Sequence, residues 1–239
     1  LSVSLPFDSL HVGTGFDFMY ENVGPTNTVA FFFDYAYRIK ATPNTQLSFG
    51  LKGGFSYLQA NLIELDRYHE DDSYIIEHGD FTSFMPNFGV GLFWFNENFY
   101  AGLSVPKLLQ NKYIKDQVST EAASKEERHY SIHGAYLFDL SPNFIFKPAI
   151  TTYMVSGAPL TADFDFGFMF QKMVWLGAKY RISDAVGGYV QFQVENLKIG
   201  VSYDYSHTRL SQFNRGTYEI MLRYDFKLKA TQVFPILGF

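Results

Sequence analysis

Three residues with hydrolytic potential, His129, Ser131 and His133, recur at every second position of one segment. A serine becomes a nucleophile when its hydroxyl is hydrogen-bonded to an imidazole that a third group orients. On a β-strand, however, these side chains stand beside one another on one face rather than across from one another. We therefore interpret them as a polar lining and predict that the chain is not an enzyme. A hydrolase is the alternative, and its activity would disappear in Ser131→Ala.

An acidic segment, residues 66–80, offers enough carboxylate oxygen for a calcium site. Its carboxylates belong to Asp66, Glu70, Asp71, Asp72, Glu77 and Asp80. Their spacing does not match the ligand pattern of a calcium loop, and charge runs usually keep a surface solvated. We predict a solvated loop without metal. Glycine pairs such as Gly53-Gly54 lack the strand-then-helix context of a nucleotide site, so we expect no cofactor.

The elements that position these residues are predicted to be β-strands. Residues 218–228 alternate without a break, and the residues of their apolar face are Tyr218, Ile220, Leu222, Tyr224, Phe226 and Leu228. Charged residues dominate the other face. A period of two with one apolar and one charged face is typical of a strand that is buried or lipid-covered on one side.

The same alternation recurs in about thirteen segments, many of them near the roughly 9 to 11 residues that a tilted membrane strand requires. Bacterial barrels usually have even strand counts, so we expect one more strand before Leu1, about fourteen in all. The sequence predicts one domain, residues 1–239, that folds as an antiparallel transmembrane β-barrel. A soluble β-sandwich is the alternative, since alternation shows only that one face is covered.

Composition agrees with strands that are half apolar. Aromatic residues make up 19% of the 239 residues, yet the mean hydropathy is only -0.08. No apolar run approaches the roughly 18 residues of a membrane helix. The net charge of -5 and dispersed Lys and Arg argue against nucleic-acid binding. The absence of cysteine excludes disulfides and is compatible with a cell-envelope protein.

Short and long connections alternate along the chain. Tight turns at residues 42–45, 96–98 and 171–172 alternate with longer connections, notably 61–85 and 107–128. Outer-membrane barrels place short turns in the periplasm and long loops outside. We therefore expect the long loops outside and the C-terminus in the periplasm. The chain opens in strand-like sequence, so we also expect an N-terminal signal and an opening segment to precede it.

Charged residues of both signs fall on the polar faces of the predicted strands. They can pair with one another or receive the polar backbone of a partner segment. Lys147 belongs to this set, and the residues that we single out as candidates for binding a partner in the lumen are Asp34, Arg38, Lys52, Asp163, Asp165, Lys179, Arg181, Asp204, Glu219, Arg223 and Asp225.

The amino-acid sequence of several predicted strands resembles that of the PorP/SprF family of type IX secretion system membrane proteins. The resemblance runs from about residue 24 to 226 with order and spacing kept, and its segments include 34–38 (DYAYR), 47–52 (LSFGLK), 86–91 (PNFGVG), 102–109 (GLSVPKLL), 128–130 (RHY), 175–181 (WLGAKYR) and 218–226 (YEIMLRYDF). The family's Asn-Pro-containing opening segment is not found here, and the ending, residues 233–239, is unlike the short basic ending expected.

The resemblance implies a non-enzymatic outer-membrane barrel that supports export and surface anchoring of large secreted proteins such as gliding adhesins. Its implied partners are the C-terminal domain of a secreted adhesin, periplasmic components of the type IX and motility machinery, and outer-membrane lipid. The alternative is a channel or transporter for small or hydrophobic solutes.

Overall fold

The computed structural model describes residues 1–61, 80–113, 125–208 and 215–226, which form strands joined mainly by turns. One short 3-10 helix, η1 (Asp8–Leu10), follows the first strand. The strands are β1 (Ser2–Phe7), β2 (Val12–Val23), β3 (Thr26–Thr42), β4 (Thr45–Asn61), β5 (Asp80–Phe95), β6 (Phe99–Val105), β7 (His129–Tyr136), β8 (Phe138–Ser141), β9 (Phe144–Val155), β10 (Thr161–Phe170), β11 (Val174–Arg181), β12 (Ala185–Val194), β13 (Leu197–Ser206) and β14 (Thr217–Tyr224).

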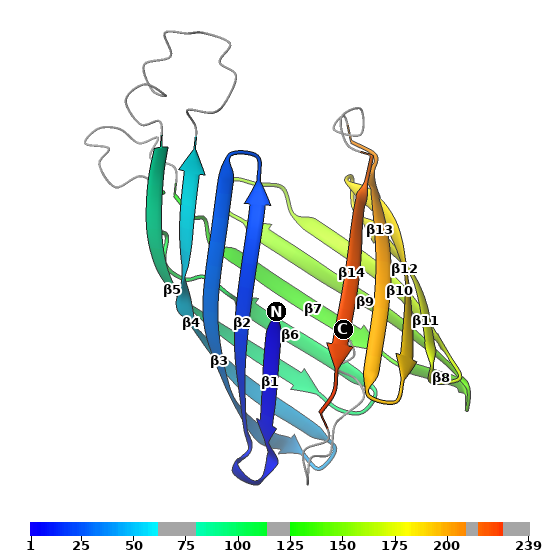
Figure 1. Ribbon diagram of the computed structural model, residues 1–239. Coiled ribbons are helices and arrows are strands. Elements are labelled where there is room, and N and C mark those ends of the chain that lie inside the picture. The colour runs from blue at the N-terminus through cyan, green and yellow to red at the C-terminus, as the bar shows by residue number, and fades with distance from the viewer. Residues whose placement is uncertain (62–79, 114–124, 209–214, 227–239) are drawn as a thin grey trace. The chain divides into compact units, whose positions relative to one another are not determined.

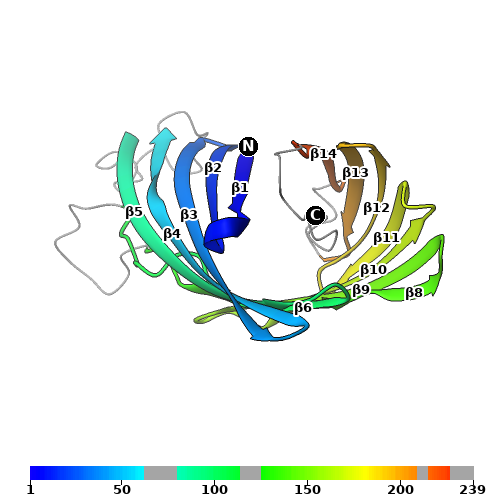
Figure 2. The same ribbon diagram turned by 90° about the horizontal axis from the view of Figure 1, so that it is seen from below.

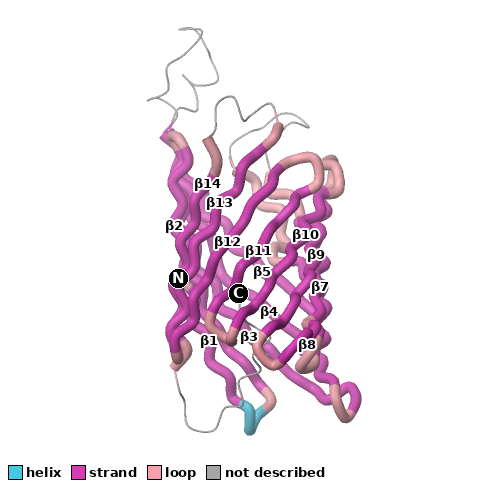
Figure 3. Tube along the Cα trace, turned by 90° about the vertical axis from the view of Figure 1, so that its right-hand side faces the viewer, coloured by secondary structure: helices cyan, strands magenta, loops and turns pink. Residues whose placement is uncertain are grey.

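Chain neighbours are sheet neighbours in this topology except at β7 and β8, because β7 pairs with β9. The 14 antiparallel strands form one sheet whose order runs from β1 to β14, with β8 beside that path, paired to β9. Figure 3 shows the strands joined by short turns over much of the chain. The prediction of an all-β antiparallel fold is confirmed. The described residues do not pair β1 with β14, so closure into a barrel is not part of what the structure shows.

Three predicted boundaries need correction. The described residues contain 14 strands where alternation predicted about thirteen, because one segment predicted as a single strand is divided at Leu137 into β7 and β8. The strand predicted to end at residue 228 ends at Tyr224, which pairs with Leu197, the first residue of β13. Beyond this pair the Asp225 amide still donates to the carbonyl of Asn196, in the turn before β13. β5 begins at Asp80, inside the predicted 61–85 loop. The expected strand before Leu1 stays a prediction.

Internal contacts divide the chain into two compact units. The first comprises Leu1–Arg38, Ser48–Gly91 and Ser104–His129, and the second comprises Ile39–Leu47, Leu92–Leu103 and Tyr130–Phe239. In the first unit, β1 pairs with β2, and β2 pairs with β3 in a register that sets Asp17 opposite Phe32. Figure 1 shows these strands side by side in blue. In the second unit, β9 to β13 pair in chain order and β14 completes the row, as Figure 2 shows.

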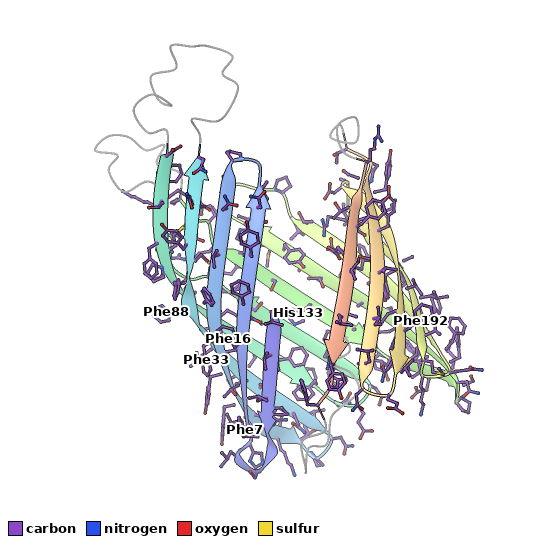
Figure 4. All side chains as sticks on the ribbon, in the orientation of Figure 1. Phe7, Phe16, Phe33, Phe88, His133 and Phe192 are labelled. Atoms are coloured by element: carbon purple, nitrogen blue, oxygen red, sulfur yellow. The ribbon has the colours of Figure 1, made fainter. Side chains whose placement is uncertain are left out.

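Each unit leaves the apolar faces of its strands exposed. Phe33 and Phe88 in the first unit are 57% and 59% exposed, and Phe192 in the second is 54% exposed. Figure 4 labels these side chains on the ribbon. A soluble sandwich would bury such faces against a second sheet. Large exposed apolar surfaces mark membrane or protein contacts, and a β-rich chain of this kind fits an outer membrane.

Candidate functional site on the polar faces

The polar face of the second unit is a grid, because the registers of β9 to β14 align its polar positions from strand to strand. Successive paired residues form three rows, which are Lys147, Gly167, Gly177, Tyr189, Ser202 and Glu219; Asp165, Lys179, Gly187, Asp204 and Thr217; and Met169, Trp175, Gln191, Gly200 and Met221. Alternate residues of a strand point to one face, so all three rows share one face.

Two glycines of the first row make room for the Tyr189 side chain. A Cβ atom added at Gly177 would overlap the Tyr189 ring, and one at Gly167 would lie 2.7 Å from the Tyr189 hydroxyl. The ring can therefore lie flat along the row, where its hydroxyl donates to Asp165 Oδ1 over 3.1 Å. The glycines set the position of an aromatic wall rather than loosening the strands.

The charged groups of this grid have two kinds of surroundings. Arg181 donates from Nε and Nη2 to the two oxygens of Asp163 over 2.7 and 2.9 Å, the bidentate geometry of a strong ion pair. The two lysines face rings instead: Lys147 Nζ lies 5.2 Å from the Trp175 ring centroid, and Lys179 Nζ lies 5.4 Å from that of Tyr189. Both distances are within the range of cation–π attraction.

A cavity of about 570 Å³ opens on this part of the grid. Its lining includes Lys147, Asp165, Trp175, Lys179, Tyr189, Gln191, Ser202, Glu219 and Met221. Gln191 is 8% exposed, and its buried Nε2 makes no hydrogen bond among the described residues. A buried amide donor without a partner costs about 1–3 kcal/mol. The cavity thus combines two ammonium groups, aromatic walls and an unsatisfied donor.

Further polar contacts join the polar faces of β13 and β14 and the residue that follows β14. Arg223 donates to Asp225 over 2.7 Å, and the buried Lys198 lies 3.8 Å from the same carboxylate. Ser202 donates to Glu219 over 3.0 Å. The Asp204 carboxylate lies over Gly187, where an added Cβ would overlap it, and its buried Oδ1 has no partner among the described residues.

In the first unit, the polar face is organised by Lys52. Its ammonium contacts Asp17 at 2.5 Å and Asp34 at 3.4 Å, and lies 5.2 Å from the Phe32 ring centroid. Phe32, which interrupts the alternation on the polar side, is buried. Arg38 donates to the Val12 carbonyl over 3.4 Å. One cation therefore holds two carboxylates on neighbouring strands.

A buried polar cluster, which we name the Glu126 clamp, holds the segment after β6 against β5. Its members are Asn87, Lys107, Asn111 and Glu126. Glu126 accepts from Lys107 over 2.6 Å, from Asn111 over 2.8 Å and from Asn87 over 3.2 Å. Asn87 is 1% exposed and bonds the backbone of Leu109 in both directions, with its amide donating over 3.0 Å and its carbonyl accepting over 2.9 Å.

Two neighbours support the clamp. At Gly89 an added Cβ would lie 2.5 Å from the Pro106 carbonyl oxygen, so only glycine permits this close backbone approach. Burial, assisted by the charge of Glu126, raises the pKa of the Tyr113 phenol, which keeps that hydroxyl neutral beside the clamp. No periodic signal in the sequence announces a contact between residues 39 positions apart, Asn87 and Glu126.

The proposed polar lining at His129, Ser131 and His133 belongs to β7. The His133 ring packs 5.8 Å from Phe93 and 6.2 Å from Tyr100 between ring centroids. It also covers Gly102, where an added Cβ would overlap the imidazole. His133 is therefore part of the aromatic packing of the second unit, which Figure 4 marks with its label.

The structure places the predicted lumen residues on polar faces in two groups. Asp34, Arg38 and Lys52 belong to the first unit, and the others belong to the second. Alternation also marked two polar-face residues that we did not single out, Lys198 and Gln191. The clamp was missed entirely. A role of any of these residues in binding stays a prediction.

Within residues 1–61, 80–113, 125–208 and 215–226, no group of three or more His, Asp or Glu could hold a metal ion. In the acidic segment only Asp80 is described, so the predicted loop at 66–79 lies outside the described residues. No helix in those ranges is long and apolar enough to cross a bilayer.

Comparison with known families assigns this chain to a protein family. The model of the family "Type IX secretion system membrane protein PorP/SprF" matches residues 1–224. The chain belongs to the PorP/SprF family. No curated protein matches it. This PorP/SprF protein is a membrane component of a type IX secretion system, and its family is not a known enzyme family.

Proposed function

We propose that this PorP/SprF protein supports export and surface anchoring of large secreted proteins of the gliding-adhesin type by binding their C-terminal domain. The observation that carries the proposal is the cavity on the polar face of the second unit, where Lys147, Lys179 and the unsatisfied Gln191 amide lie together. A protein segment that leaves water needs partners for its charges and backbone groups. A polar face with an unsatisfied hydrogen-bond donor can supply such partners.

The proposed setting is a closed barrel in the outer membrane with lipid against its apolar face. On β13 the exposed positions are Leu197, Ile199, Val201, Tyr203 and Tyr205, and the intervening positions carry Lys198 and Asp204. Embedding such a face in lipid removes apolar surface from water, worth roughly 25 cal/mol per Å². Closure would involve β14 with β1 or with a strand preceding it.

The proposed orientation sets the long loops outside and the tight turns in the periplasm, where they would meet periplasmic type IX and motility components. The chain has no cysteine, so single cysteines can report it. Ser156→Cys, between β9 and β10, should react with a membrane-impermeant maleimide in intact cells. Glu97→Cys, in the turn between β5 and β6, should react only after the outer membrane is permeabilised. The reverse pattern would contradict this orientation.

Co-purification tests the binding itself. A tagged secreted C-terminal domain should retain the wild-type barrel, and the charge-reversed double variant Lys179→Glu with Glu219→Lys should be lost from the complex. Lys172→Glu, on the exposed turn after β10, is the matched control and should be retained. A wild-type barrel isolated intact without any secreted partner would contradict the proposal. Solute flux through the reconstituted barrel, unaffected by the domain, would support the transporter instead.

A further inference from the structure

The charges that line the cavity on β9 to β14 already balance one another. The lining contains two ammonium groups, Lys147 and Lys179, and two carboxylates, Asp165 and Glu219, so its formal charges cancel. Asp165 interacts electrostatically with both lysines. A further charge that entered the cavity would disturb this balance and would lose its own hydration. The cavity is therefore suited to an uncharged ligand.

The unused hydrogen-bonding capacity of the lining consists of a neutral donor and carboxylate oxygens. Gln191 is 8% exposed, and its Nε2 has no partner among the described residues. Glu219 accepts from Ser202 through Oε2, and Asp165 accepts from Tyr189 through Oδ1. Each carboxylate thus keeps a second oxygen that no group of the described residues bonds. A ligand that uses both kinds of group must accept from Gln191 and donate to a carboxylate.

The positions of these groups favour an amide over a hydroxyl. Gln191 and Glu219 belong to adjacent rows of the polar face, which are two residues apart, about 7 Å along the strands. A hydroxyl has its donor and its acceptor on one atom. An amide has a carbonyl acceptor and a separate N–H donor, which point to opposite sides of a trans peptide, so it can join two rows.

The walls of the cavity surround this polar pair with apolar surface. Gly200 lies between Gln191 and Met221 in their row and contributes no side chain. A Cβ atom added at Gly200 would lie 3.2 Å from Met221 Cε and 3.5 Å from Gln191 Cβ, so these two side chains border the space above it. The Trp175 and Tyr189 rings supply further walls. Mostly apolar walls with a few placed polar groups are typical of binding pockets, and 570 Å³ is within their usual range.

We propose that this cavity is an amide-binding pocket, in which Gln191 donates to the carbonyl oxygen of an uncharged amide and Glu219 accepts from its N–H group. The amide belongs to a backbone peptide group or to an Asn or Gln side chain with apolar neighbours. The inference rests on the proposed function only in naming a polypeptide as the bearer of the amide. An acidic group of the same shape is disfavoured, because the lining has no charge left to balance it.

Fluorescence of the protein in non-ionic detergent tests the pocket directly. The chain has two tryptophans, Trp94 and Trp175, so Trp94→Phe leaves Trp175 in the cavity as the sole reporter. The probes are N-isobutylacetamide for a backbone peptide group and isocaproamide for a side-chain amide. Isobutyl acetate keeps the carbonyl of the first probe without its N–H, and isocaproate is the charged analogue of the second. At least one amide should change the Trp175 emission saturably, and the amide that binds more tightly identifies the source.

The two proposed hydrogen bonds are tested by separate variants. Gln191→Met keeps the length of the side chain and should weaken binding of the amide about fivefold, as expected for loss of one hydrogen bond. Gln193→Met, the same substitution two residues along β12 and outside the cavity lining, should leave the dissociation constant within about twofold. If Gln191→Met does not fold, as judged by circular dichroism, Gln191→Leu replaces it.

Glu219→Ala tests the N–H group of the ligand. On the wild-type protein the ester should bind about fivefold more weakly than N-isobutylacetamide, because it cannot donate to Glu219. In Glu219→Ala this difference should disappear, since the amide loses its acceptor and the ester loses nothing. Glu97→Ala removes the same charge from the exposed turn between β5 and β6 and should preserve the difference.

Four results would overturn the pocket: no saturable change with either amide, isocaproate that binds as tightly as isocaproamide, an ester that equals its amide, or unchanged amide affinity in the Gln191 variant. These results are distinct from failure of the proposed function. A protein that retains the secreted domain but binds no amide probe loses only the pocket. A protein that binds the amides but never retains the domain keeps the pocket and loses the proposed partner.

Discussion

The Glu126 clamp should control how firmly residues 106–113 are held against β5. In Glu126→Ala the Lys107, Asn111 and Asn87 donors lose their shared acceptor. Asn87 and Asn111 keep one backbone acceptor each, Leu109 and Pro86, so the segment is weakened rather than stripped of its bonds. The neighbouring Glu127, with its side chain 32% exposed, pairs with Lys125 and Gln110 and offers a matched control.

The magnitude follows from the three bonds. Hydrogen bonds to a charged group contribute about 1.5–3 kcal/mol each. The Lys107 side chain is 36% exposed and the Asn87 bond is the longest at 3.2 Å, so both count for less than this range. We expect a loss of about 3 kcal/mol, comparable with breaking a buried pair at its lower limit. For Glu127→Ala we expect less than about 1 kcal/mol.

Hydrogen exchange measures this opening locally. The amides of Leu108 and Leu109 donate to Phe88 O and to Asn87 Oδ1, so they exchange when the segment lifts. Since each 1.4 kcal/mol is a factor of ten, the Glu126→Ala variant should exchange these amides about 100-fold faster. Amides of β13 should be unchanged. Equal exchange in the two alanine variants, or acceleration spread to β13, would refute the reasoning.

Two further predictions concern the faces of the second unit. Gly177→Val should displace the Tyr189 ring and lower the free energy of unfolding in urea by about 1–3 kcal/mol, as overpacking does. Ala178→Val, on the exposed side of β11, is the control and should change this free energy little. Equal losses in the two variants would contradict the argument that Gly177 makes room for Tyr189. Val201→Lys should destabilise the protein in lipid vesicles by about 2–4 kcal/mol if Val201 lies near the bilayer midplane. Ser202→Lys on the polar face should cost less, and a reversed order would mean that the faces are assigned wrongly.

Alternation was sufficient to predict which face each strand residue takes, because the period of two is a property of the backbone. Phe33 and Tyr35 are exposed and Asp34 is half-buried between them, as the pattern indicates. It could not predict partners, since those depend on register and on distant segments. That Lys52 meets Asp17 follows from strand pairing, and that Asn87 meets Glu126 follows from a chain reversal without any periodic signal.

Glycines mark a second limit of the sequence. The pattern shows that Gly167 and Gly177 lie on the polar face, and small residues there suggest empty space. In the structure the space is filled by Tyr189, whose ring lies over Gly177 and whose hydroxyl reaches Gly167. The large Tyr189 on β12 and the glycines in the same row on β11 and β10 therefore depend on one another, because the glycines leave the space that the tyrosine fills. Only the register, which sets Tyr189 opposite Gly177, makes this visible.

The two kinds of charge on the polar face also differ in what a partner could gain from them. Asp163 already occupies two donors of Arg181, so a partner group must break that bidentate pair before it binds either residue. Lys147 and Lys179 face rings, and cation–π attraction is worth about 0.5–1 kcal/mol at exposed sites and about 2 kcal/mol for a desolvated cation such as the buried Lys147. Lys147 and Lys179 therefore present their ammonium groups to ring faces in the cavity that Gln191 also lines, whereas Arg181 presents a guanidinium that is already bound to Asp163.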